Sequence, residues 1–164
     1  MSFVSRLSSF LGIKMIPISN SIVSGVALSE INGETKMLLM KRVKGGFWCH
    51  VAGSMEEGEL PWQTIVREFQ EETKIEVTEL YNGQFLEQFY ESYSNVIEII
   101  PVFVVKCPAN QEVILNHEHT DFKWCSLEEA LELSPFPTQH AAFKHVWEYF
   151  VDKPINELCR IKLG

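Results

Sequence analysis

The stretch that decides the fold is residues 53–75, GSMEEGELPWQTIVREFQEETKI. It predicts a glycine-bounded loop followed by an amphipathic helix that starts at Pro61, where a proline loses nothing because the first helical N–H groups have no partner. At about 100° per residue, one helix face gathers five residues that we expect to pack on the core. They are Trp62, Ile65, Val66, Phe69 and Thr73.

Three glutamates lie together on an adjoining, solvent-side arc of this helix. Glu68 precedes Glu71 and Glu72 by three and four residues, so the side chains are neighbours and their charges repel. A bound cation would relieve that repulsion, and carboxylate oxygens suit Mg²⁺ or Mn²⁺. A solvated acidic face is the alternative interpretation of the same residues, and the spacing of the flanking residues favours the metal.

That spacing resembles the Nudix box, Gly-x5-Glu-x7-Arg-Glu-U-x-Glu-Glu-x-Gly-U, where U is a bulky apolar residue. The matching residues are Gly53, Glu59, Arg67, Glu68, Phe69, Glu71, Glu72 and Ile75. One position departs, because Lys74 stands where the family has glycine. The left-handed conformation at the end of a helix costs a residue other than glycine about 1–2 kcal/mol of steric strain, which glycine avoids. The departure therefore bears on the helix cap and not on the metal ligands.

The resemblance implies an α/β fold, an α/β/α sandwich with a mixed β-sheet between helices and the catalytic helix at one sheet edge. It also implies an enzyme in which divalent cations, Mg²⁺ or Mn²⁺, assist the attack of water on a phosphorus of a nucleoside diphosphate derivative. Arg67 would orient the box carboxylates, and Glu59 would support the loop. The implied metal ligands are the carbonyl oxygen of Gly53 and the side chains of Glu68, Glu71 and Glu72.

Two glutamates outside the box are candidates for the general base, because family members differ in whether the box supplies it. Glu98 is the one charged residue of an apolar strand expected at residues 96–105, and a solvated strand face would equally explain it. Glu118 lies in a polar segment that ends at Trp124, similar to a loop and strand seen in many Nudix proteins. We favour Glu118, which is also a candidate metal ligand.

Substrate contacts are expected from Arg42, Phe47 and Trp48, although aromatic residues beside a site more often belong to the core. Residues 47–59 resemble the corresponding segment of nucleoside- and dihydroneopterin-triphosphate pyrophosphohydrolases. This resemblance implies that a triphosphate is cleaved to a monophosphate and pyrophosphate. Dinucleoside polyphosphates and nucleotide sugars are the alternative substrates. A Nudix fold that only binds a nucleotide as a regulator is a further alternative, which the intact box carboxylates disfavour.

The rest of the chain predicts strands around the box helix. Asn32-Gly33 is a two-residue hairpin signal, and Pro101 suggests that its strand is an edge or carries a bulge. Ser126 to Glu129 form a capping box that opens a short helix, and Thr138 is expected to cap the last helix. The expected strands are residues 21–31, 37–42, 47–52, 75–80, 81–90 and 96–105.

Length and charge indicate one domain, 1–164, in which residues 1–20 are a lead-in segment or a first strand. A net charge of −8 disfavours a nucleic-acid partner but not a small phosphorylated substrate, because bound cations reverse the local field. The sequence lacks the apolar run of a membrane span and the features of a signal peptide. We therefore expect a cytoplasmic protein, with a homodimer left open. Reduced thiols are expected at the widely spaced Cys49, Cys107, Cys125 and Cys159.

Overall fold

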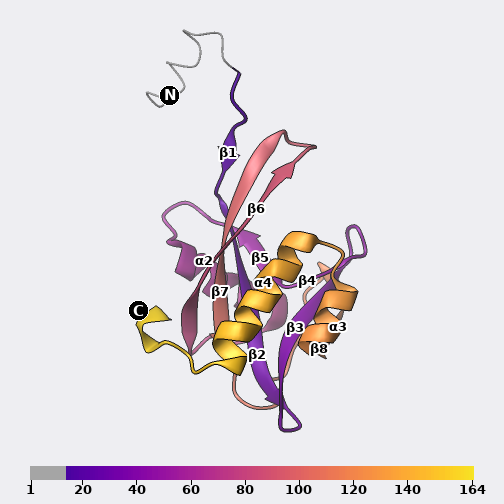
Figure 1. The fold of residues 1–164 in the computed structure, drawn as a ribbon, viewed down its shortest axis with the longest axis vertical. Helices are drawn as coiled ribbons and strands as arrows, with labels where there is room; N and C mark the ends of the chain where they lie inside the picture. Colours follow the sequence, from indigo (N-terminus) through magenta and orange to yellow (C-terminus); the bar gives the residue numbers. More distant parts are fainter. Residues whose placement is uncertain (1–13) are drawn as a thin grey trace.

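The computed structural model describes residues 14–164 as a mixed sheet with helices against both faces (Figure 1). This arrangement confirms the predicted α/β fold class. The strands are β1 (Ile18–Ser19), β2 (Ile22–Ile31), β3 (Glu34–Arg42), β4 (Trp48–Cys49), β5 (Val51–Ser54), β6 (Leu80–Glu91), β7 (Val96–Lys106), β8 (His119–Cys125) and β9 (Arg160–Ile161). The helices are α2 (Pro61–Thr73), α3 (Leu127–Leu133) and α4 (Pro137–Trp147), which runs on as a π-helical turn at Glu148–Asp152. A 3-10 turn follows at Glu157–Cys159.

The central path of the sheet runs β4-β3-β2-β7-β6-β9, and β1, β5 and β8 pair with β7, β2 and β3 respectively. Strands β2 and β7 are parallel, while β2 and β3 form the predicted hairpin. Its turn residues, Asn32 and Gly33, have φ angles of 52° and 84°, as a tight hairpin turn of the mirror-image type requires. Of the expected lead-in segment, residues 1–13 lie outside the described part of the chain, and β1 falls within the remainder.

Alternate residues of the same strands supply two apolar cores, because successive side chains of a strand point to opposite faces. One core lies under α4 and includes Val26, Leu28, Val104 and Phe143. The other lies under α2 and includes Val23, Ala27, Phe103, Ile65 and Phe69. In Figure 1 the two helices lie on opposite sides of the sheet, α4 nearer the viewer. The predicted apolar face of α2 is therefore confirmed.

Close packing of α2 on β2 depends on a glycine. A Cβ atom at Gly25 would stand 2.8 Å from both Ile65 Cγ1 and Phe69 Cε2, which is closer than real side chains approach. Without a side chain at this position, the helix can lie directly on the strand. This approach brings the glutamates of α2 to the end of the sheet where β5 leads into the box loop.

Four local expectations were wrong. Residues 75–79 are not a strand, because Ile75 and Val77 fill the core under α2 while the chain passes from the helix to β6. Strand 47–52 is broken at His50 into β4 and β5. Strand β7 is central and not an edge: Pro101 falls in the gap between its pairings with β1 and with β2, and the register shift of the β6–β7 ladder lies on β6, between Asn82 and Phe85. The last helix is capped at Phe136 with Pro137 in the first turn, and Thr138 lies inside it.

The capping box at Ser126 and Glu129 is confirmed, with each side chain accepting a hydrogen bond from the other residue's backbone N–H. All four cysteines are free thiols. None of the helices formed by residues 14–164 has the length and apolar character needed to cross a bilayer.

Lys74 ends α2 in the left-handed conformation, with φ 59° and ψ 14°. Its backbone N–H donates to the carbonyl oxygen of Gln70 at 3.2 Å. The expectation that this position needs the geometry of the family glycine is confirmed, and the lysine side chain bears the steric cost of a positive φ.

Lys74→Gly is therefore expected to leave the free energy of unfolding unchanged or to raise it by up to about 1 kcal/mol, because relief of the strained φ offsets the greater freedom of glycine in the unfolded chain. Chemical denaturation measures the change. Lys74→Ala, which keeps the Cβ atom and loses the charge, is the matched control and should not be stabilising. A clear loss of stability in Lys74→Gly would contradict the assignment of strain to this residue.

Candidate active site

Arg67 ties the loop before α2 to the acidic arc of the helix. Its Nε and Nη2 atoms donate to the Glu59 carboxylate at 2.7 and 3.0 Å, and Nη2 also donates to the Ser54 carbonyl oxygen at 3.0 Å. Its Nη1 atom donates to Glu68 at 2.8 Å and to Glu71 at 3.3 Å. Hydrogen bonds from Arg67 lower the pKa of Glu59 to about 2. The guanidinium therefore fixes the positions of three carboxylates at once.

Glu68 lies directly against the backbone of β5. A Cβ atom at Gly53 would stand 2.1 Å from both the carboxyl carbon and Oε1 of Glu68, so only glycine leaves room for this side chain. Burial raises the pKa of Glu68, and the bond from Arg67 opposes that rise. The first glycine of the box thus serves to bring a glutamate against the strand.

Glu72 is buried, which corrects the expectation of a solvent-side residue. Its exposed fraction is 4%, and its Oε2 atom makes no hydrogen bond within residues 14–164. Burial, followed by the charges of Glu68 and Glu118, raises the pKa of Glu72 to about 8, while Arg42 opposes the rise. Residues 114–116 pass the end of α2, where the Ile114 and Asn116 N–H groups donate to the carbonyl oxygens of Thr73 and Glu72 at 2.9 and 3.2 Å.

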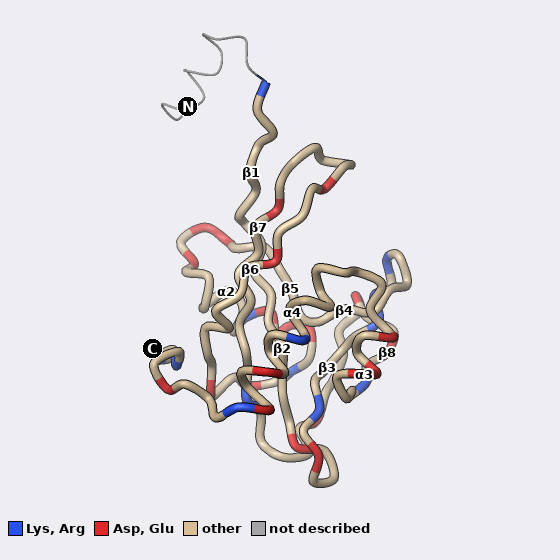
Figure 2. Tube along the Cα trace, in the orientation of Figure 1, with Lys and Arg blue, Asp and Glu red and all other residues tan. Residues whose placement is uncertain are grey.

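The acidic side chains have the chemistry that a divalent cation requires, but their oxygen atoms do not converge on a common point. Within residues 14–164, no three His, Cys, Asp or Glu side chains are positioned so that they could hold a metal ion as they stand. Arg67 holds Glu68 and Glu71, and the Glu71 side chain is 55% exposed. The unpartnered Glu72 oxygen and the neighbouring like charges are nevertheless what a bound cation would stabilise. The acidic positions before and within α2 appear red in Figure 2.

A cavity of about 810 Å³ opens beside these glutamates, within the size range of small-molecule sites. Of the predicted site residues, it is lined by Arg42, Phe47, Gly53, Glu68, Glu72 and Glu118. The cavity therefore brings together three candidate metal ligands of the box, one glutamate from outside the box and two candidate substrate contacts.

Four predicted residues lie elsewhere. Trp48 packs against the core under α4 and does not line the cavity, in line with the core interpretation. Arg67 and Glu71 are absent from the lining, and Arg67 donates to Glu68, which belongs to it. Glu98 is buried in β7 opposite Phe89, with 9% exposure, and is also absent from the lining. Of the two general-base candidates outside the box, only Glu118 thus faces the cavity.

Several cavity residues were not predicted from the sequence. The walls include Phe89, Tyr90 and Glu91 near the end of β6, and Phe136 from the turn before α4, whose ring lies edge-on to Phe47 at 5.1 Å. Three buried polar residues, Ser24, His50 and Glu87, also belong to the lining. Ser24 stands out as a polar residue in a mostly apolar strand, but no pattern in the sequence showed that the three would meet.

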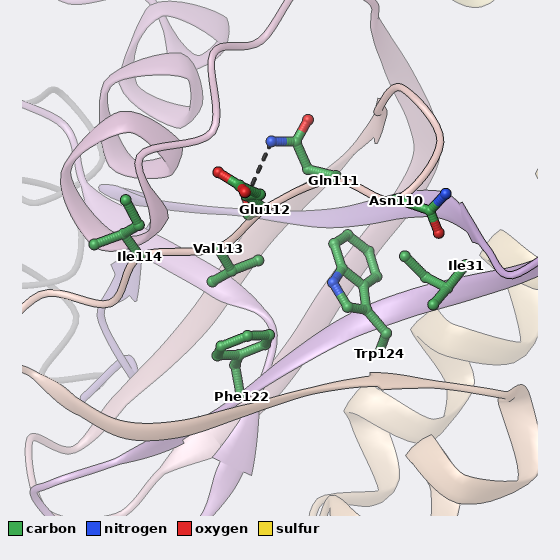
Figure 3. Close-up of a pocket in the computed structure, with 8 residues that line it drawn as sticks. All are labelled: Ile31, Asn110, Gln111, Glu112, Val113, Ile114, Phe122 and Trp124. Atoms are coloured by element: carbon green, nitrogen blue, oxygen red, sulfur yellow. Dashed lines mark hydrogen bonds between the residues drawn. The ribbon is translucent and has the colours of Figure 1, made fainter.

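A second cavity, of about 500 Å³, is lined by residues 110–114 together with Ile31, Phe122 and Trp124 (Figure 3). Figure 3 shows the Trp124 and Phe122 rings on one side and Val113 and Ile114 facing them. No residue of the 53–75 stretch lines it. The box glutamates therefore border only the first of these two cavities, and the acidic residue in the lining of the second is Glu112.

Comparison with known proteins agrees with this geometry. The bis(5'-nucleosyl)-tetraphosphatase [asymmetrical] of Caenorhabditis elegans is 28% identical over 114 residues, covering 68% of this chain and 82% of that protein. The dihydroneopterin triphosphate diphosphatase of Haemophilus influenzae is 29% identical over 123 residues, covering 66% of this chain and 75% of that protein. A crystal structure of a C. elegans Ap4A hydrolase superposes with a TM-score of 0.69 at 22% identity, covering 77% of this chain and 94% of that one.

A longer protein also matches. The octanoyltransferase of Myxococcus xanthus is 32% identical over 118 residues, which cover 68% of this chain but only 33% of that protein. Residues 22–146 match the family model described as NUDIX domain, a range that contains the helix, the box loop and every cavity residue named above. Together with the box spacing and the fold, this match shows that the chain belongs to the Nudix hydrolase family.

Proposed function

We propose that this chain uses Mg²⁺ or Mn²⁺ to hydrolyse a nucleoside-triphosphate-like substrate to a monophosphate and pyrophosphate, acting as a single Nudix domain of the cytoplasm. The observation that carries the proposal is the one cavity that joins Glu68, Glu72 and Glu118 to the aromatic residues Phe47 and Phe136. A nucleotide has the same two parts, an anionic phosphate chain and a planar ring. The sequence similarity to a dihydroneopterin triphosphate diphosphatase supports the triphosphate class.

Each residue has a role that follows from its place. Glu68, Glu72 and Glu118, with the Gly53 carbonyl oxygen, would hold the cation, and Glu71 could join them by leaving Arg67. A divalent cation would neutralise phosphoryl charge and make water more acidic. Arg67 keeps Glu68 oriented against β5. Arg42 offers a positive charge to the phosphates, and Phe47 offers a ring face or edge to the base.

Dinucleoside polyphosphates are the second candidate substrates, since a tetraphosphatase is among the similar proteins. Incubation with Mg²⁺ and a panel of nucleoside triphosphates, dihydroneopterin triphosphate, diadenosine tetraphosphate and nucleotide sugars separates the classes. A triphosphate that gives pyrophosphate releases inorganic phosphate only when pyrophosphatase is added, whereas cleavage of a dinucleoside tetraphosphate gives two nucleotides. No product from any compound, with nucleotide binding retained, would instead indicate a regulator.

Glu118→Gln is expected to lower kcat strongly with little change in KM, because a general base acts mainly in the transition state. Glu98→Gln, a buried carboxylate outside the cavity, is the matched variant and should act chiefly on stability. The measurement is kcat for both variants over a pH series. If only Glu98→Gln loses the acidic limb of the rate profile, Glu98 and not Glu118 is the general base. An unchanged limb in both variants would place the base within the helix cluster.

A further inference from the structure

Three buried polar side chains line the cavity beyond the box glutamates. Ser24, His50 and Glu87 are 1%, 3% and 3% exposed, and all three belong to the cavity lining. They come from three separate segments: β2, the break between β4 and β5, and β6. None of them belongs to the 53–75 stretch, so the metal chemistry does not account for them.

The sheet register places all three on one face. Ser24 pairs with Val102 and Glu87 pairs with Ile100, two residues earlier on β7, and residues two apart on a strand share a face. Ser24 also pairs with Ala52, and His50 precedes Ala52 by two residues. This face is the one under α4, where the His50 ring meets Phe143 edge-on at 5.3 Å.

The trio keeps hydrogen-bonding capacity that residues 14–164 do not use. His50 Nε2 lies 2.9 Å from Glu87 Oε1, yet neither atom is in an aligned hydrogen bond. Ser24 Oγ and His50 Nδ1 also have no partner among these residues. Buried polar atoms are normally hydrogen-bonded, because leaving them unpaired is costly. Their place in a cavity wall points to a ligand as the missing partner.

We propose that Ser24, His50 and Glu87 form a ring-recognition subsite for the 2-amino-4-oxopyrimidine edge that guanine and pterin share. The inference rests on the proposed function and names the class of base within it. This edge presents an amino group, a ring N–H and a carbonyl oxygen side by side. An ionised carboxylate only accepts, and its two oxygens match the two adjacent donors. His50 or Ser24 supplies the donor for the carbonyl oxygen.

Other bases match this arrangement less well. Adenine and cytosine each present a ring nitrogen lone pair beside their amino group, which a carboxylate would face with like polarity. Uracil offers a single donor between two acceptors. Hypoxanthine has the ring N–H and the carbonyl oxygen but lacks the amino group, so one carboxylate oxygen would stay unpaired. A site built for hydrogen bonds rejects a ligand that leaves its polar groups unpaired.

The test compares kcat/KM of the full chain for GTP, ITP, ATP, CTP and dihydroneopterin triphosphate with Mg²⁺. GTP and ITP differ only in the 2-amino group, and we expect a preference for GTP of roughly tenfold or more, the worth of one hydrogen bond to a charged group. Glu87→Gln should reduce the GTP-to-ITP ratio towards one. Glu98→Gln, a buried carboxylate on the neighbouring strand outside the cavity, should keep the wild-type ratio. The ratio of GTP to dihydroneopterin triphosphate distinguishes guanine from pterin.

The outcomes distinguish a failure of the subsite from a failure of the proposed function. Hydrolysis with equal rates for GTP, ITP and ATP, or an unchanged ratio in Glu87→Gln, would overturn the subsite and leave the proposed function standing. If no compound is hydrolysed, the proposed function fails, and calorimetric Kd values for GTP and ITP test the subsite separately. If Glu87→Gln does not fold, Ser24→Ala replaces it. This variant should lower the ratio of kcat/KM for GTP, or for dihydroneopterin triphosphate, to kcat/KM for ATP.

Discussion

Glu72→Gln is expected to lower kcat by about two orders of magnitude or more at saturating Mg²⁺. Losing a few kcal/mol of charge stabilisation around a bound cation costs roughly tenfold in rate per 1.4 kcal/mol. Glu72 is the box glutamate with the strongest claim to a cation, because it is 4% exposed and its Oε2 atom has no hydrogen-bond partner within residues 14–164. Turnover is measured with the best substrate of the nucleotide panel.

The free energy of unfolding of the metal-free wild type and of Glu72→Gln, measured over a pH series, tests whether the loss of turnover comes from a loss of fold. Burial raises the pKa of Glu72 from 4.5 to about 8, so between these values the folded protein keeps a proton that the unfolded chain releases. Stability in EDTA should therefore fall as pH rises through this window. Because glutamine cannot ionise, the stability of Glu72→Gln should fall less steeply with pH. Wild-type turnover in Glu72→Gln would remove this residue from the metal site, and an unchanged slope would show that its carboxyl is not held in a buried place.

Gly53→Ala is expected to reduce activity nearly as much, through Glu68. The added Cβ would stand 2.1 Å from the Glu68 carboxyl carbon and 2.5 Å from its Cγ, so this side chain must leave β5. The move also breaks the 2.8 Å bond from Arg67. Because the carboxylate is the far end of a flexible chain, the backbone can stay in place. We expect kcat to fall by about tenfold to a hundredfold, as for the loss of a supporting contact at a metal site, with a small change in melting temperature.

Gly25→Ala is the contrasting variant. Its Cβ would press on Ile65 and Phe69, which are fully buried core residues of α2, and not on a carboxylate. Overpacking of this kind typically costs about 1–3 kcal/mol, so this variant should melt earlier while its folded fraction turns over substrate. If Gly53→Ala instead loses stability and keeps activity, the close approach of Glu68 to β5 is structural and has no part in the chemistry.

The sequence by itself determined the features that depend on neighbouring residues. The helix at 61–73, its apolar face, the Asn32-Gly33 hairpin and the capping box at Ser126 follow from local spacing and backbone preference. The left-handed conformation at Lys74 followed from the glycine that the family has at this position. The box spacing also identified the family, because three glutamates on one helix turn need only the helical period to be neighbours.

Only the tertiary structure decided which groups are covered and which distant residues meet. Glu72 has the same sequence signal as Glu71, yet Glu72 is 4% exposed and the Glu71 side chain is 55% exposed. Pro101 lies in a central strand because β1 and β2 pair on either side of it. Ser24, His50 and Glu87 meet through the register of β2, β7 and β6, which no local pattern encodes. Burial and register depend on what packs against a segment, and the residues that do so lie tens of positions away along the chain.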